Sequence, residues 1–178
     1  MLPGGVVRWL PVVAVSLAVL PAAALVVPPR ARALRGRGVP AQLARRHAIA
    51  EVGLVAGTLP WLWMILTPLP AAREVRALPL RDLADLLAGA PLTAFFQIGG
   101  NLLVFAALGF FAAARWGWGP LAATAAGALA SLAVESSQYL LALGRVSSVD
   151  DVLLNAAGAG IAAALCHRWW PLPAPSVC

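Results

Sequence analysis

Five apolar segments, each about long enough to cross a lipid bilayer, limit what this chain can fold into more than any other feature. They span Leu10–Val27, Ile49–Leu69, Phe95–Ala114, Leu121–Leu143 and Asp150–Trp170. A helix needs about 20 apolar residues to cross the hydrocarbon core. Charged residues are only 11% of the chain, against about 25% in soluble domains. The sequence therefore predicts an all-α, multi-pass helix bundle in the cell membrane, with about five transmembrane helices.

The first apolar segment has one feature of a signal peptide, because the basic residue Arg8 precedes it. However, Pro21 interrupts the segment, and Pro28-Pro29-Arg30 stands where a small-residue cleavage site is preferred. We expect this helix to be retained, and cleavage is the alternative.

The basic residues are all arginine, and they lie beside the apolar segments. Six of them fall between residues 30 and 47, a stretch without an acidic residue. Because such loops stay in the cytoplasm, we predict a basic cytoplasmic loop at 30–47, with the N-terminus outside and the C-terminus cytoplasmic. This topology explains the net charge of +6 without a nucleic acid partner. It divides the chain into residues 1–47 and a membrane domain at 48–178.

Two further elements follow from local patterns. Leu80–Leu87 has apolar residues at helical spacing between charged ones, which indicates a short interfacial helix. Glu51 lies near the expected start of the second helix, where we expect the positive helix pole to stabilise its carboxylate.

Glu135 is an ionisable residue inside the fourth apolar segment. A charged side chain at a helix centre costs about 2.5 to 3.5 kcal/mol on insertion scales, so it must face other helices. At helical spacing it belongs to a stripe of small and polar residues, which also contains Thr124, Gly127, Ser131 and Gln138. We predict that this stripe packs against neighbouring helices.

Asn101 and Asn155 place amides in the third and fifth helices. At a rise of about 1.5 Å per residue, Asn101 and Glu135 lie roughly 9 Å below the outer surface, and Asn155 roughly 6 Å. Three segments therefore bring polar side chains to one level near the outer leaflet.

Arg145 is the expected counter-ion at this level, because its guanidinium can reach Glu135, Asp150 or Asp151. Ser148 and Asp151 match the spacing of a capping box at the start of the fifth helix. Asp150 and Asp151 are therefore interpreted as helix caps rather than as catalysts.

Together, these polar residues form a pattern that resembles the motifs of the VanZ-like family. The pattern comprises Glu135-Ser-Ser-Gln138, Gly144-Arg145, Asp150-Asp151-Val-Leu-Leu-Asn155-Ala-Ala-Gly158 and, upstream, Asn101-Leu-Leu-Val-Phe105-Ala-Ala-Leu-Gly109-Phe110. The resemblance is closest over residues 95–165. The family pattern has a proline at the position of Ala107, so we expect a straighter third helix here. The resemblance implies a small membrane protein of the bacterial cell envelope, and the founding member is associated with resistance to the glycopeptide teicoplanin.

The sequence leaves several functions open. The first is a pocket near the outer leaflet that binds a lipid head group or a cell-wall precursor, with Arg145 meeting an anion. The second is an intramembrane enzyme with Glu135 as general acid or base, although Ser136 and Ser137 have no histidine nearby to activate them. The third is a small transporter, for which no inverted repeat is visible. The predicted binding residues are Asn101, Glu135, Gln138, Arg145, Asp150, Asp151 and Asn155.

The two cysteines, Cys166 and Cys178, are too few and too badly spaced for a metal site. We predict no metal and no cofactor. The oligomeric state stays open.

Overall fold

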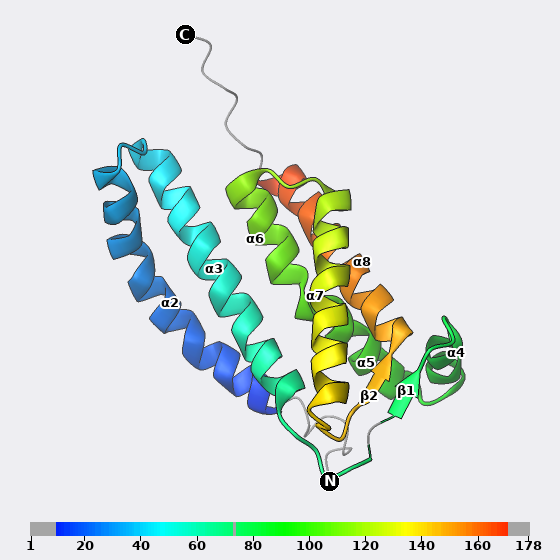
Figure 1. Cartoon of the computed structure of the whole chain (residues 1–178). Coiled ribbons are helices and arrows are strands. Elements are labelled where there is room, and N and C mark those ends of the chain that lie inside the picture. Colours follow the sequence, from blue (N-terminus) through cyan, green and yellow to red (C-terminus); the bar gives the residue numbers. More distant parts are fainter. Residues whose placement is uncertain (1–9, 73, 171–178) are drawn as a thin grey trace.

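The structure is a computed structural model that describes residues 10–72 and 74–170, and it is a bundle of long helices (Figure 1). The helices are α2 (Leu10–Gly36), α3 (Ala41–Leu66), α4 (Arg81–Ala88), α5 (Pro91–Val104), α6 (Ala106–Trp116), α7 (Pro120–Leu140) and α8 (Val149–Trp169). The long helices alternate in direction along the chain, with α5 and α6 running the same way as two halves of one segment, and the short helix α4 lies at one end beside two strands. The predicted all-α class is confirmed.

Within residues 10–72 and 74–170, four helical segments are long and apolar enough to cross a membrane. They are Val13–Gly36, Ala41–Leu66, Pro91–Trp116 (α5 and α6 taken together) and Val149–Trp169. The remaining long helix, α7, has 21 residues but includes Glu135 and Gln138, which lower its hydropathy. Composition therefore supports a membrane-embedded bundle.

The basic segment at 30–47 is mostly helical, so the prediction of a loop there was wrong. Helix α2 continues to Gly36, and α3 begins at Ala41. Only a short turn joins them, in which Gly38 has a φ of 86°, a conformation that glycine adopts without steric penalty. Both helices are longer than the apolar segments that predicted them. Arginine is itself a good helix former, so the helices continue into the basic stretch. The division of the chain at residue 47 stays a prediction.

The third membrane segment is broken, although the sequence predicted a straighter helix. Helix α5 ends and α6 begins at Phe105, whose backbone has φ −111° and ψ 11°. On either side of this break the chain lies against α8, where a methyl group added to Gly158 would overlap the carbonyl group of Leu102. A methyl group on Gly109 would likewise overlap the carbonyl group of Ala159. The break lets both halves approach α8 closely, with or without a proline.

Helix α8 is the centre of the bundle and packs against α5, α6 and α7. Small residues line these contacts: Ala113, Ala123 and Ala163 are buried together with Cys166. Small side chains allow helices to approach closely, which is how helices associate in a membrane. The interior is therefore built from backbone contact more than from large apolar side chains.

Helix α2 lies at the edge of the bundle and packs mainly on α3, through Ala31, Leu34, Ala44 and Ala48. Most of its other large apolar side chains point outward, and Leu25 is 77% exposed. An outward apolar surface suits a lipid environment.

Glu51 joins three helices at the end of the bundle remote from α4. Its carboxylate accepts hydrogen bonds from Arg30 Nε of α2 (2.6 Å) and Arg115 Nε of α6 (2.7 Å). Because α3 begins ten residues earlier, at Ala41, Glu51 lies beyond the first turn. The positive pole of α3 acts only within that first turn. The carboxylate of Glu51 is therefore stabilised by the guanidinium groups of Arg30 and Arg115, and not by the helix pole as expected.

Two short strands, β1 (Glu74–Arg76) and β2 (Val146–Ser148), pair in parallel at the other end. In their register Glu74 pairs with Val146, and Arg76 with Ser148. The sequence did not predict this sheet. The short helix predicted at 80–87 is confirmed as α4, and its interfacial position stays a prediction.

Candidate functional site

A cavity of about 630 Å³ opens at the end of the bundle that holds α4 and the sheet. Residues of α3, β1, α4, α5, α7, β2 and α8 line it. All the predicted binding residues except Asp150 are in its wall, namely Asn101, Glu135, Gln138, Arg145, Asp151 and Asn155. Apolar side chains such as Phe96 and Val134 share the wall, so the cavity is amphipathic.

The polar stripe of α7 faces inward, as predicted. Gly127, Ser131, Glu135 and Gln138 are buried, and Glu135 is only 9% exposed. Gln138 Nε2 donates to the carbonyl oxygen of Ile65 (2.8 Å), which ties α7 to the last turn of α3. Glu135 Oε2 is buried without a hydrogen-bond partner among the described residues. An unpaired carboxylate oxygen in a cavity wall is an acceptor available to a ligand.

Asn155 supplies a second such acceptor from α8. Its Nδ2 donates to Ser131 Oγ (2.8 Å), while its Oδ1 is buried with no partner in the described part of the chain. The side chain is 5% exposed. The bond to Ser131 fixes the amide so that the carbonyl oxygen remains available.

Asp151 does not complete the capping box that its spacing predicted. Ser148 is the N-cap of α8, and its Oγ accepts from the backbone N–H of Asp150 (3.2 Å). Asp151 instead accepts a hydrogen bond from Asn101 Nδ2 of α5 across the cavity wall. Tertiary packing thus directs the carboxylate toward α5 rather than back to its own helix.

Arg145 lines the cavity, but its hydrogen bonds differ from the expected carboxylate contacts. Its guanidinium donates to the carbonyl oxygens of Met64 (2.7 Å) and Thr67 (3.0 and 3.1 Å). These carbonyls belong to the end of α3, where backbone acceptors lack helical partners. Arg145 therefore caps the C-terminus of α3 at the cavity.

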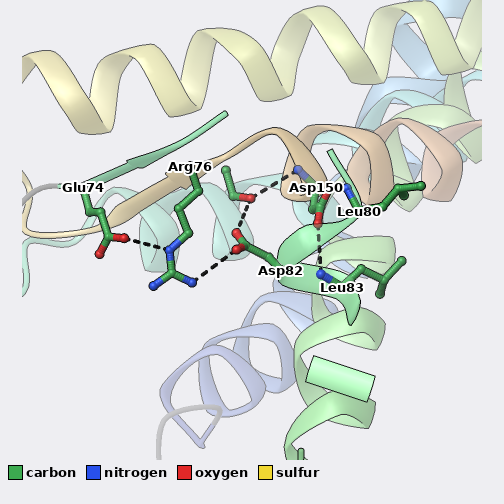
Figure 2. Close-up of polar contacts among 7 residues, drawn as sticks. Glu74, Arg76, Leu80, Asp82, Leu83 and Asp150 are labelled. Atoms are coloured by element: carbon green, nitrogen blue, oxygen red, sulfur yellow. Dashed lines mark hydrogen bonds and ion pairs between the residues drawn. The ribbon is translucent and has the colours of Figure 1, made fainter. Parts of the chain in front are cut away.

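Asp150 is not among the residues that line the cavity, and its carboxylate holds α4 in place (Figure 2). Its two carboxylate oxygens accept from the backbone N–H groups of Leu80 (2.5 Å) and Leu83 (2.9 Å). Leu80 is the N-cap of α4 and has a left-handed φ of 64°. From the sequence, Asp150 is interpreted as a cap of its own helix, whereas in the structure its carboxylate accepts from the N-terminal amides of α4.

Sequence reasoning missed the residues that complete the network in Figure 2. Arg76 donates twice, from Nε to Glu74 Oε1 (2.8 Å) and from Nη1 to Asp82 Oδ1 (3.3 Å). The other oxygen of Asp82, Oδ2, accepts a hydrogen bond from Ser148 Oγ (2.6 Å). Hydrogen bonds to Glu74 and then Asp82 raise the pKa of Arg76. Arg76 and Asp82 line the cavity. Only the charge of this segment signalled them, because the sheet that positions them has no sequence pattern.

The fold and the cavity define a class: a helical membrane protein with an amphipathic polar cavity at one end. The VanZ/LLP1 family model matches residues 54–170, which is more than half of the chain. The chain therefore belongs to the VanZ/LLP1 family. No curated protein and no solved structure matches it.

Proposed function

We propose that this VanZ/LLP1 protein binds the polar head of a membrane lipid or of a lipid-linked cell-wall precursor in the cavity, at the outer leaflet of the cell membrane. The observation that carries the proposal is the pairing of buried polar groups with apolar side chains in one wall. Glu135 and Asn155 offer free acceptor atoms beside Phe96 and Val134. Such a wall suits an amphiphile, whose head and chain need both environments.

The membrane topology that we propose has five crossing helices, with α7 as the fifth. Helix α7 lies beside α8, and its large apolar residues Leu121 and Leu129 point outward. The end of the bundle remote from the cavity includes Arg37, Arg46 and Arg115, and by the positive-inside rule that end is cytoplasmic. The cavity then faces the outside.

Head-group binding is favoured over catalysis by the surroundings of the serines next to Glu135. Ser137 Oγ donates to the carbonyl oxygen of Ala133 (2.7 Å), and neither Ser136 nor Ser137 lines the cavity. His167 contacts the carbonyl of Trp118 at the far end of the bundle. The arrangement offers Glu135 no activated nucleophile.

A role in the cell envelope follows from the same proposal. A protein that holds a wall precursor at the outer leaflet would alter how that precursor meets a glycopeptide. This is how we connect the chain to the teicoplanin resistance that the family resemblance implies.

Filling the cavity tests the proposal. We expect wild-type protein, purified with its native lipids, to retain a bound lipid by native mass spectrometry. Thr93→Trp puts an indole into the cavity wall from α5 and should abolish this adduct. Ser136→Trp adds the same bulk to α7 at an exposed position outside the cavity, and it should keep the lipid. Equal lipid retention in all three proteins would remove the cavity as the binding site.

A further inference from the structure

We propose that the cavity recognises a primary ammonium group, carried by the head of the bound amphiphile. This inference deepens the proposed function and rests on it. The juxtaposition that carries it is a wall with more carboxylates than guanidinium groups and with two buried acceptor atoms that have no partner.

The charge of the wall favours a cation. Glu135, Asp82, Asp85 and Asp151 line the cavity, against only two basic residues, Arg76 and Arg145. An anionic group placed there would meet this excess of carboxylates, and like charges disfavour it. The anion that the sequence assigned to Arg145 is therefore a poor occupant.

The two basic residues already donate to the protein. Arg145 donates to the carbonyls of Met64 and Thr67, and Arg76 donates to Glu74 and Asp82. An anion would have to compete with these bonds for its donors.

Among the described residues, the two atoms of the cavity wall that are buried without a partner are both acceptors. Glu135 Oε2 and Asn155 Oδ1 are buried in the cavity wall, in side chains that are 9% and 5% exposed. A buried acceptor without a partner is costly, so an occupant of this cavity must donate hydrogen bonds. An ammonium group has three N–H donors and a positive charge, and it satisfies both requirements.

A divalent metal ion fits the wall less well. No group of three or more His, Cys, Asp or Glu side chains in the described residues is placed to hold a metal ion. The carboxylates lie on α4, α7 and α8 and surround the cavity instead of converging on one point. This spacing suits an organic cation with a larger volume.

The test compares lipids that have the same acyl chains and different heads, titrated into the delipidated full-length protein and followed by native mass spectrometry. Phosphatidylethanolamine has an ammonium with N–H donors, phosphatidylcholine has the charge without the donors, and phosphatidylglycerol has hydroxyl donors and a net negative charge. We expect phosphatidylethanolamine to bind about tenfold more tightly than either of the others, as hydrogen bonds to a charged group predict.

Glu135→Gln should lower the affinity for phosphatidylethanolamine about tenfold. Glu74→Gln, which neutralises a carboxylate outside the cavity, is the matched control and should leave the affinity unchanged. Asp85→Asn changes an exposed cavity residue of α4 and provides a second variant in case Glu135→Gln does not fold.

Free phosphoethanolamine separates the two sources of the ammonium. If free phosphoethanolamine displaces the lipid, the cavity recognises the head group alone. If it does not displace the lipid, the cavity needs a head group that is attached to acyl chains. Either result supports recognition of the ammonium. Phosphatidylglycerol binding as tightly as phosphatidylethanolamine, or Glu135→Gln without effect, overturns the ammonium inference and leaves head-group binding intact. Absence of binding by all three lipids overturns the ammonium inference together with phospholipid head-group binding.

Discussion

Gly158→Ala is expected to destabilise the bundle by about 1 to 3 kcal/mol, the range for overpacking a close interior. The added methyl group would overlap the backbone carbonyl of Leu102, which cannot rotate away as a flexible side chain could. Helix α8 would have to move away from α5. Asn155 lies three residues before Gly158 on α8. The displacement would therefore also disturb the hydrogen bond that Asn155 donates to Ser131 of α7.

Gly99→Ala is the matched control, because a methyl group there has no neighbour within 4 Å. In a helix interior, alanine is favoured over glycine by about 1 kcal/mol, so this variant should be as stable as the wild type or slightly more stable. Thermal unfolding in detergent compares the three proteins. If Gly158→Ala melts together with Gly99→Ala, the backbones of α5 and α8 are not in contact.

Asp150→Ala should release α4 from the bundle while the long helices remain folded. The substitution leaves the N–H groups of Leu80 and Leu83 without their acceptors, and each unsatisfied donor costs about 1 to 3 kcal/mol if it stays buried. The left-handed backbone of Leu80 adds about 1 to 2 kcal/mol that nothing else offsets. We therefore expect α4 to unfold locally.

Hydrogen exchange measures this effect residue by residue. Amides of α4 should exchange roughly tenfold to a hundredfold faster in Asp150→Ala, and those of α7 should be unchanged. Asp85→Ala removes an exposed carboxylate from α4 itself and should leave the exchange of the helix nearly unaltered. Unchanged exchange of α4 in Asp150→Ala would show that another contact holds this helix. Because α4 forms part of the cavity wall, its release should also weaken lipid binding.

The long helices and the buried stripe of α7 could be predicted because both follow from periodicity. Apolar runs of bilayer length located the long helices, and the spacing of Gly127, Ser131, Glu135 and Gln138 identified the packed face. The depth estimates brought Asn101, Glu135 and Asn155 together, and all three line one cavity. Their roles in binding remain predictions.

What could not be predicted depends on contacts between distant segments. A three-residue strand such as β1 has too few positions to show a period, and its partner β2 lies far along the chain. Arg145 was matched to a carboxylate because charge is visible in a sequence, whereas the free carbonyls at the end of α3 are not. The break at Phe105 likewise follows from the glycine contacts with α8 and has no proline to signal it.

The proposed head-group site requires that the cavity opens to the outside of the cell. Labelling of introduced cysteines by a membrane-impermeant thiol reagent in intact cells tests this directly. The experiment uses full-length protein in which Cys178 is replaced by serine, and the buried Cys166 is retained. Asp85→Cys places a thiol on the cavity wall, and Arg37→Cys places one in the turn between α2 and α3 at the opposite end. We predict that intact cells label Asp85→Cys and leave Arg37→Cys unlabelled until the membrane is permeabilised. Labelling of Arg37→Cys alone in intact cells would put the cavity in the cytoplasm and contradict a head-group site at the outer leaflet.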